Sequence, residues 1–249
     1  MQDRHVPALT TRYWFAFTAA AMFGANAGDV IDAWLASWSV AGLNLHLPLL
    51  LLVYVGILIF ERYDPSASHG WYWLAMVVVT PAAIEFGDLA TIHLGLDRGG
   101  VFILLVVALA ISHLMLRTQT AWLLALHMKS RHPRAVPLTD APYWVALVMA
   151  GTAGVMANDY LALSRKLDSS IVVLTLAVCT AAAIALYLQR RLNRILTYWL
   201  LVVALCALGN AMGSLLMEQP GLGQIGSVIL SGVLLAALLA TLRAGQARP

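Results

Sequence analysis

Eight long apolar stretches, separated by short polar segments, constrain the fold of this chain more than any other feature of its sequence. Each is long enough to cross the roughly 30 Å hydrocarbon core of a bilayer as a helix. Backbone amides inside a bilayer must be paired within the chain, so stretches of this length predict helices. They lie at about 12–34, 43–60, 72–94, 99–117, 143–163, 169–189, 197–217 and 222–242. We expect an all-α polytopic membrane protein with eight transmembrane helices.

The composition removes most other classes of protein. Hydrophobic residues make up 61% of the 249 residues and charged residues 11%, against about 25% charged in an ordinary soluble domain. With a mean hydropathy of +0.82, the chain cannot be a soluble enzyme, a secreted disulfide scaffold or a disordered segment. Cys179 and Cys206 form no CxxC motif, and no P-loop, GxSxG or HExxH motif occurs. We therefore expect no enzyme, no catalytic residue and no resident cofactor.

The lysines and arginines lie mostly on one side of an eight-helix arrangement. Twelve fall at the two termini or in the loops near 61–71, 117–142 and 189–197, and three fall on the other side: Arg98, Arg165 and Lys166. This bias predicts that both termini are cytoplasmic in a bacterial inner membrane. It also explains the net charge of +3 as an orientation signal, so the expected partner is the lipid bilayer and not nucleic acid.

A repeated pattern divides the chain into four units. Tyr-Trp occurs at 13–14, 72–73, 143–144 and 198–199, and fifteen residues after each Trp come Asp29, Asp88, Asp159 and Ser214. A second apolar stretch that ends in an arginine follows each motif. The chain is thus one membrane domain, 1–249, of four parallel helical hairpins. The predicted repeats are about 12–62, 71–117, 142–191 and 197–243, with a basic cytoplasmic linker at 118–141.

Two features of the repeat have structural interpretations. Tyr-Trp is typical of an aromatic anchor at the membrane interface, here at the cytoplasmic end of the first helix of each repeat. Small residues four positions apart let helix backbones approach closely. These small pairs are Gly24/Gly28, Ala83/Gly87 and Gly209/Gly213.

The same residues carry a resemblance to a known family. From Tyr13 to Arg243, the chain resembles the bacterial membrane proteins described as a fourfold repeat of unknown function, in which each two-helix repeat has a characteristic tryptophan and a later Gly-Asp. The carriers are Trp14, Trp73, Trp144 and Trp199, with Gly28-Asp29 and Gly87-Asp88. The third repeat reads Asn158-Asp159 and the fourth reads Gly213-Ser214. The resemblance implies the architecture and leaves the function to be argued from the site.

The acidic residues of the repeat predict a cation site. Fifteen residues of helix place each Asp about 22 Å beyond its Trp, in the outer half of the membrane. Parallel repeats put equivalent residues at equal depth, so they form a candidate ring between the first helices of the repeats. Carboxylates that face one another without basic partners repel, so they favour a bound cation or take up protons. The predicted metal ligands are Asp29, Asp88 and Asp159, supported by Glu85, Asp32, Asn26 and Ser214.

The function predicted from this pattern is secondary transport of a cation with possible proton coupling. Oxygen-rich ligands suit a divalent ion such as Mn²⁺, Mg²⁺ or Ca²⁺, and a zinc site would use more histidine or cysteine. His46, near Pro48 at the start of the second apolar stretch, is as compatible with an interfacial role as with a ligand role. The alternative is a non-transporting assembly or sensor protein in which the acids close helix ends. The ion, the direction of transport and the oligomeric state stay open.

Overall fold

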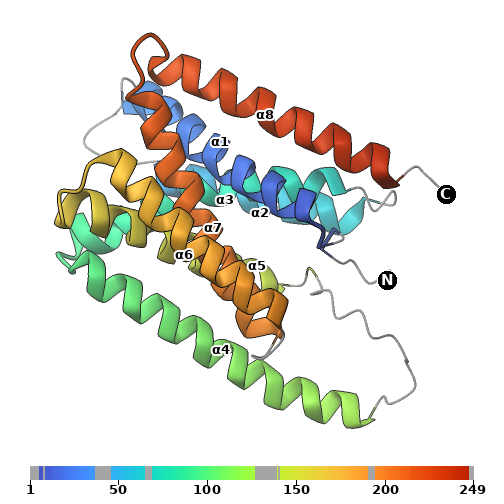
Figure 1. Ribbon diagram of the computed structural model, residues 1–249. Coiled ribbons are helices and arrows are strands. Elements are labelled where there is room, and N and C mark those ends of the chain that lie inside the picture. The colour runs from blue at the N-terminus through green and yellow to red at the C-terminus, as the bar shows by residue number, and fades with distance from the viewer. Residues whose placement is uncertain are drawn as a thin grey trace.

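The computed structural model describes residues 6–7, 9–36, 46–64, 69–126, 139, 141–189 and 194–246, and within these ranges it contains helices and no strand. Eight α-helices run across the molecule (Figure 1). Two short π-helical segments, η1 and η2, continue α3 and α5. The elements are α1 (Thr11–Ala36), α2 (His46–Tyr63), α3 (His69–Asp88), η1 (Leu89–His93), α4 (Arg98–Leu126), α5 (Ala141–Asp159), η2 (Tyr160–Ser164), α6 (Ser169–Gln189), α7 (Arg194–Met217) and α8 (Gly223–Gln246).

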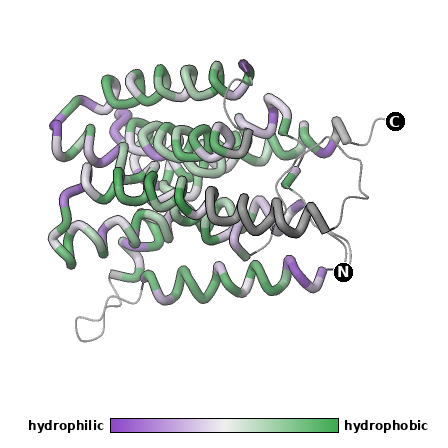
Figure 2. The backbone as a smooth tube through the Cα atoms, turned by 90° about the horizontal axis from the view of Figure 1, so that it is seen from below, coloured by the Kyte–Doolittle hydropathy of each residue, from purple (hydrophilic) through white to green (hydrophobic). Residues whose placement is uncertain are grey.

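The helices form an inner and an outer layer. About half of the apolar part of α3, α5 and α7 is buried (50%, 56% and 56%), against 22%, 22% and 17% for α2, α6 and α8. Helix α1 belongs to the inner layer, since Ala16, Phe17 and Ala20 are fully buried. Hydrophobic residues run along the helices and hydrophilic ones gather near their ends (Figure 2). The outer helices therefore present apolar faces that suit contact with lipid.

The packing order is cyclic. The inner helices contact one another in the order α1, α3, α5, α7, and α7 contacts α1 again. Each outer helix packs on the inner helix of the next repeat: α2 on α3, α4 on α5, α6 on α7 and α8 on α1. The start of α1 and the end of α8 lie at the same end of the bundle, where Arg12 Nη1 is 3.4 Å from the Thr241 carbonyl oxygen (Figure 1).

The four tyrosines of the Tyr-Trp motifs meet inside this bundle. Their hydroxyl oxygens form a closed ring with separations of 2.6, 3.0, 3.0 and 3.4 Å, and each tyrosine is at most 4% exposed. The expectation that these dipeptides anchor the protein at the membrane interface is therefore wrong for the four tyrosines, and also for Trp73, Trp144 and Trp199, which are buried too. A buried phenol needs a hydrogen-bond partner, and the cyclic order of the helices supplies one from the next repeat. The members of this tyrosine ring are Tyr13, Tyr72, Tyr143 and Tyr198.

Small residues bring the inner helices together, as the sequence predicts. A Cβ atom on Gly154 would lie 2.8 Å from the Val203 carbonyl oxygen of α7, and one on Gly209 would lie 2.9 Å from the Thr18 carbonyl oxygen of α1. Such distances leave no room for a side chain, so backbone packs on backbone at these crossings. The inner layer is consequently tight around its axis.

Within the part of the chain that the structure describes, six helices are long and apolar enough to cross a membrane: α2, α3 with η1, α5 with η2, α6, α7 and α8. By length and composition, then, the chain has the helices of a multi-pass membrane protein. Helix α1 is not among the six because Asn26, Asp29 and Asp32 interrupt its apolar stretch. Helix α4 continues through 118–126, which differs from the linker expected at 118–141. Most of the rest of that linker lies outside the described residues.

Candidate cation site

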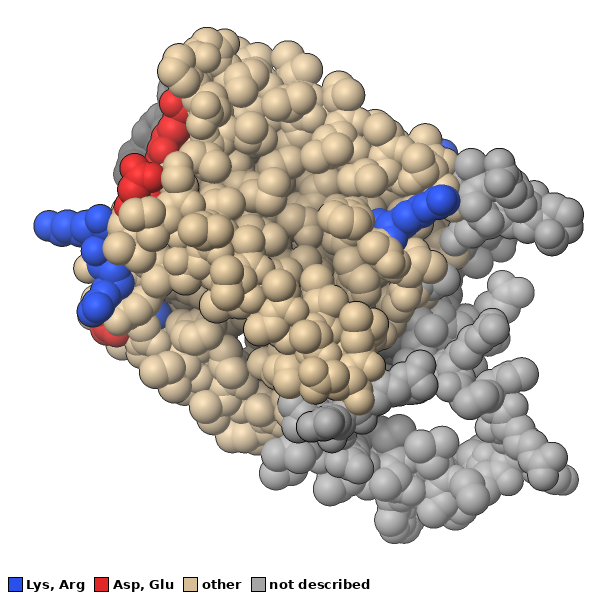
Figure 3. Space-filling model, viewed as in Figure 1, with Lys and Arg blue, Asp and Glu red and all other residues tan. Residues whose placement is uncertain are grey.

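Acidic side chains gather at the end of the bundle opposite the start of α1. On the face shown in Figure 3, acidic and basic side chains lie together at this end, and the flank between the two ends carries neither. Helix α1 contributes Asp29 and Asp32, and α3 contributes Glu85 and Asp88. Three-residue spacing places each pair on one side of its helix. Because α1 packs on α3, the two pairs are brought to the same end of the same helix interface.

Three of the predicted ring positions come together. The carboxylate of Asp29 lies within electrostatic range of those of Asp32 and Asp88. The carboxylate of Asp159 on α5 lies within range of those of Asp88 and Asp29. Carboxylates from α1, α3 and α5 therefore lie in one region of the bundle.

His46 completes a group of side chains that could hold a metal ion. Its Nδ1 atom lies 3.1 Å from Asp32 Oδ1 and 3.5 Å from Glu85 Oε1. One ligand atom from each of the three residues lies within 4.8 Å of the others. The side chains of His46, Asp32 and Glu85 are 16%, 28% and 10% exposed, so they are sheltered and still reachable. Because metal–ligand bonds to nitrogen and oxygen are about 2.0–2.6 Å long, small side-chain movements would let all three bind one ion.

Two of these ligands were expected in supporting roles, and the sequence left the role of His46 open. The signal that favours His46 is topological: in a short hairpin, the first residue of the second helix lies beside the last turns of the first. Asp32 and His46 occupy these positions in α1 and α2. Spacing along a single helix does not reveal this pairing, because the two residues belong to different helices.

Arg98 brings a positive charge into the acidic region. Arg98 is the first residue of α4, and its guanidinium interacts electrostatically with the carboxylates of Asp88 and Asp159. The Nε atom of Arg98 is buried without a hydrogen-bond partner. Segment η1 joins Asp88 to the loop that leads to Arg98. Its last hydrogen bond, 3.1 Å long, runs from the Leu94 amide to the Leu89 carbonyl. Part of the negative charge is therefore balanced from within the chain.

Helix capping is performed by other acids. Asp88 and Asp159 make no capping hydrogen bond to the π-helical segments that follow them. Nine residues later in each repeat, Asp97 Oδ2 accepts a hydrogen bond of 2.8 Å from the Gly100 amide, and Asp168 Oδ1 accepts one of 2.9 Å from the Ser170 amide. These are ordinary N-terminal helix caps. The proposal that Asp88 and Asp159 serve only to close helix ends thus has no hydrogen bond to support it.

The two remaining predicted ligands differ from the rest. Asn26 is fully buried, and neither polar atom of its amide has a hydrogen-bond partner. It packs beside Gly213 of α7, where an added Cβ would be 2.6 Å from Asn26 Oδ1. Ser214 donates a hydrogen bond of 3.3 Å to the Asn210 carbonyl in its own helix, and no described contact joins it to the carboxylates. The position equivalent to the three aspartates is therefore uncharged in the fourth repeat.

Comparisons with protein-family models, with characterised proteins and with solved structures find no match for this chain. The resemblance to the family with four two-helix repeats stays a prediction from the sequence. The functional conclusion must come from the chemistry of the site.

Proposed function

We propose that this chain is a secondary transporter of a divalent cation, built as eight membrane spans in four parallel hairpins. In this proposal it lies in a bacterial inner membrane with both termini in the cytoplasm. The one-sided distribution of lysine and arginine supports that orientation. This orientation places the carboxylates toward the outer face of the membrane, where a cation from outside the cell would reach them first.

The observation that carries the proposal is the group of Asp32, His46 and Glu85, whose ligand atoms lie within 4.8 Å of one another. Two carboxylates and one imidazole suit a borderline ion such as Mn²⁺ and also accept harder ions. Asp29 adds a further negative charge close by. Since an ionised group within a membrane span is costly unless it is paired or wet, a bound cation would offset that cost.

His46 gives this site a means of exchanging a cation for a proton. A protonated imidazole can pair with the carboxylates of Asp32 and Glu85, whereas a metal binds only a nitrogen that has lost its proton. When Nδ1 carries a proton, binding of the cation displaces it, and return of the proton favours release of the cation. Transport coupled to protons follows if the two events occur on opposite sides of the membrane.

The tyrosine ring lies at the other end of the inner layer, beyond a tightly packed core. In this proposal the conformation described here is closed at the tyrosine end, and release of the cation requires the inner helices to separate there. Rigid-body movement of one pair of repeats against the other is how repeat-built transporters change access.

The same tight packing favours one second candidate, a membrane protein that binds a cation as a sensor or assembly factor without transporting it. Backbone contacts at Gly154 and Gly209 oppose separation of the inner helices. The two candidates share the site and differ in cation flux. A sensor binds the cation, and vesicles that contain the sensor protein stay impermeable to that cation.

The test combines binding and flux on the full-length chain. We expect Mn²⁺ to raise the melting temperature of the detergent-purified protein, and Glu85→Gln and Asp88→Asn to remove most of that increase. Asp97→Asn is the matched control, because Asp97 lies at the same end and asparagine also caps helices. Mn²⁺ uptake into proteoliposomes then separates transport from binding alone. An equal Mn²⁺ shift in Glu85→Gln, Asp88→Asn and the natural protein would contradict both candidates.

A further inference from the structure

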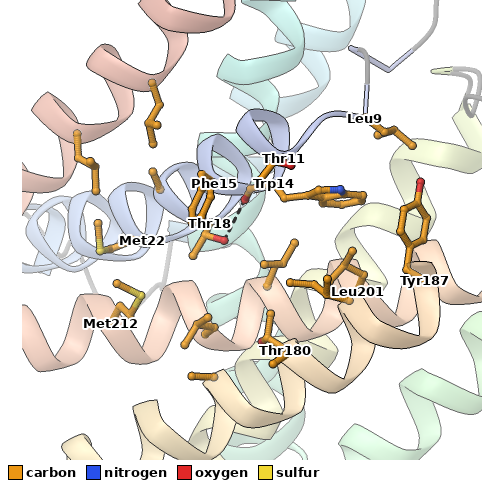
Figure 4. A pocket seen from close by; sticks show the side chains of 18 of the residues that line it. Leu9, Thr11, Trp14, Phe15, Thr18, Met22, Thr180, Tyr187, Leu201 and Met212 are labelled. Carbon is orange, nitrogen blue, oxygen red and sulfur yellow. Dashed lines mark hydrogen bonds between the residues drawn. The ribbon is translucent and has the colours of Figure 1, made fainter. Parts of the chain in front are cut away.

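A long apolar groove lies on the flank of the bundle, away from the acidic end. It has a volume of about 520 Å³, within the range of small-molecule sites. Outer helices α6 and α8 form its walls, and inner helices α1 and α7 form its floor (Figure 4). The groove follows from the packing order, because α6 rests on α7 and α8 rests on α1, which leaves a furrow between the two outer helices. The walls include Ala181, Ile184, Leu188, Leu234 and Leu238.

Two hydroxyl groups that line the groove donate hydrogen bonds within their own helices. Thr18 donates a hydrogen bond of 3.1 Å to the Trp14 carbonyl, drawn as a dashed line in Figure 4. Thr180 donates one of 2.7 Å to the Leu176 carbonyl. With these hydroxyl protons engaged, the groove offers little to water or to a polar ligand. Its chemistry therefore favours a hydrocarbon occupant.

One residue of the repeat departs from its counterparts at the groove. Trp73, Trp144 and Trp199 are 6%, 4% and 7% exposed, whereas Trp14 is only partly buried and lines the groove. Trp14 meets Tyr187 of α6 edge-on, with ring centroids 5.8 Å apart. An aromatic pair of this kind, apolar in body and polar at the edge, suits the level of lipid headgroups.

The length of the groove and the charge of Arg12 next to it point to one class of occupant. On α1 it reaches from Thr11 to Met22, a rise of roughly 16 Å, which is about half of a 30 Å hydrocarbon core and so matches one leaflet. At this end of the groove, the exposed Arg12 follows Thr11 in the chain and contacts the end of α8. We propose that the groove holds one acyl chain of an anionic phospholipid from the leaflet at the end where α1 starts, with the lipid phosphate beside Arg12.

The experiment uses the purified full-length protein and phosphatidylglycerol with a photoreactive group on one acyl chain. We expect the label to concentrate on the peptides of α1, α6 and α8 that line the groove. Ala181→Trp, which fills the groove, should weaken labelling there by at least about tenfold, the effect of losing roughly two buried methylene contacts. The matched control is Ala182→Trp, since Ala182 is exposed on the same helix outside the groove.

Headgroup specificity is tested in the same assay with phosphatidylethanolamine as competitor. The natural protein should prefer phosphatidylglycerol, and Arg12→Gln should lose that preference while its groove is still labelled. The proposal is overturned if the label spreads evenly over the outer helices, if Ala181→Trp and Ala182→Trp behave alike, or if phosphatidylethanolamine competes equally well. The proposal is also overturned if another membrane protein copurifies and its transmembrane helix protects the groove from the label.

Discussion

The hydroxyl oxygen of Tyr13 lies 2.6 Å from that of Tyr72, although 59 positions separate the two residues in the chain. The relationship recurs around the inner layer until Tyr198 returns to Tyr13 at 3.4 Å. The equivalent tyrosines of all four repeats thus provide hydrogen-bond partners for one another. Their hydroxyl groups therefore need no water molecule inside the bundle. The tyrosine ring ties the four inner helices together at one level.

Opening the tyrosine ring should cost stability. Tyr72→Phe keeps the aromatic packing but leaves the hydroxyls of Tyr13 and Tyr143 each without one partner, so we expect a loss of about 1–3 kcal/mol in the free energy of unfolding. Thermal or denaturant unfolding in detergent measures this loss. Tyr63→Phe, at a residue that is 78% exposed, should change the free energy by less than about 0.5 kcal/mol. Equal stability of the two variants would show that the ring contributes nothing.

The close crossing of α5 and α7 predicts a strong effect from one methyl group. A Cβ on Gly154 would be 2.7 Å from Cys206 Cβ and 2.8 Å from the Val203 carbonyl oxygen. Gly154→Ala must push backbone away from backbone, and we expect a loss of about 1–3 kcal/mol. Gly56→Ala is the control, because nothing lies within 4 Å of the added atom. A Gly154→Ala protein that melts no earlier than Gly56→Ala would contradict the described crossing.

Much of the fold follows from local patterns in the sequence. Long apolar stretches predict the helices, and the recurrence of Tyr-Trp with the small pairs Gly24/Gly28 and Gly209/Gly213 predicts repeats with close inner crossings. The inward direction of the tyrosines does not follow, because a Tyr-Trp pair at the end of an apolar helix suits an interface as well as a core. Only the cyclic order of the helices, a long-range property, places each hydroxyl beside the next.

Arg98 should limit the affinity of the cation site. Its positive charge lies within range of Asp88 and Asp159 and competes with an incoming cation for them. We expect Arg98→Gln to tighten Mn²⁺ binding by about tenfold, measured by isothermal titration calorimetry. Arg165→Gln, at an exposed loop position of the same end, should have little effect. Weaker binding in Arg98→Gln would mean that the arginine holds the carboxylates in place for the ion.

The buried amide of Asn26 predicts a gain in stability. Neither of its polar atoms has a hydrogen-bond partner, so burying this amide costs free energy. Asn26→Leu removes that cost and should raise the free energy of unfolding by about 1–3 kcal/mol. Asn158→Leu is the comparison. It removes the hydrogen bond of 3.1 Å that Asn158 donates to Asp159 and should not stabilise the protein. Unfolding in detergent checks both, and a destabilised Asn26→Leu protein would argue that the amide has a polar partner in solution.

The site follows from the sequence only in part. Helical spacing within α1 and α3 places Asp29, Asp32, Glu85 and Asp88 at one end, and the repeat adds Asp159. The contributions of His46 and Arg98 depend on how the chain turns between helices. Both residues open the second helix of their hairpins, next to the acidic end of the first. Loop geometry decides whether they point inward, and no periodic pattern encodes that.

The packing of α8 on α1 has a consequence for how the chain is made. Residues 37–222 separate these two helices, so a ribosome that adds about 5–20 residues each second finishes α1 roughly 10–40 s before α8 begins. During that delay the first helix, which carries Asn26, Asp29 and Asp32, lacks its final cover. Polar groups of this kind are poorly tolerated by lipid. The inner layer therefore closes around α1 only after the last hairpin has been made.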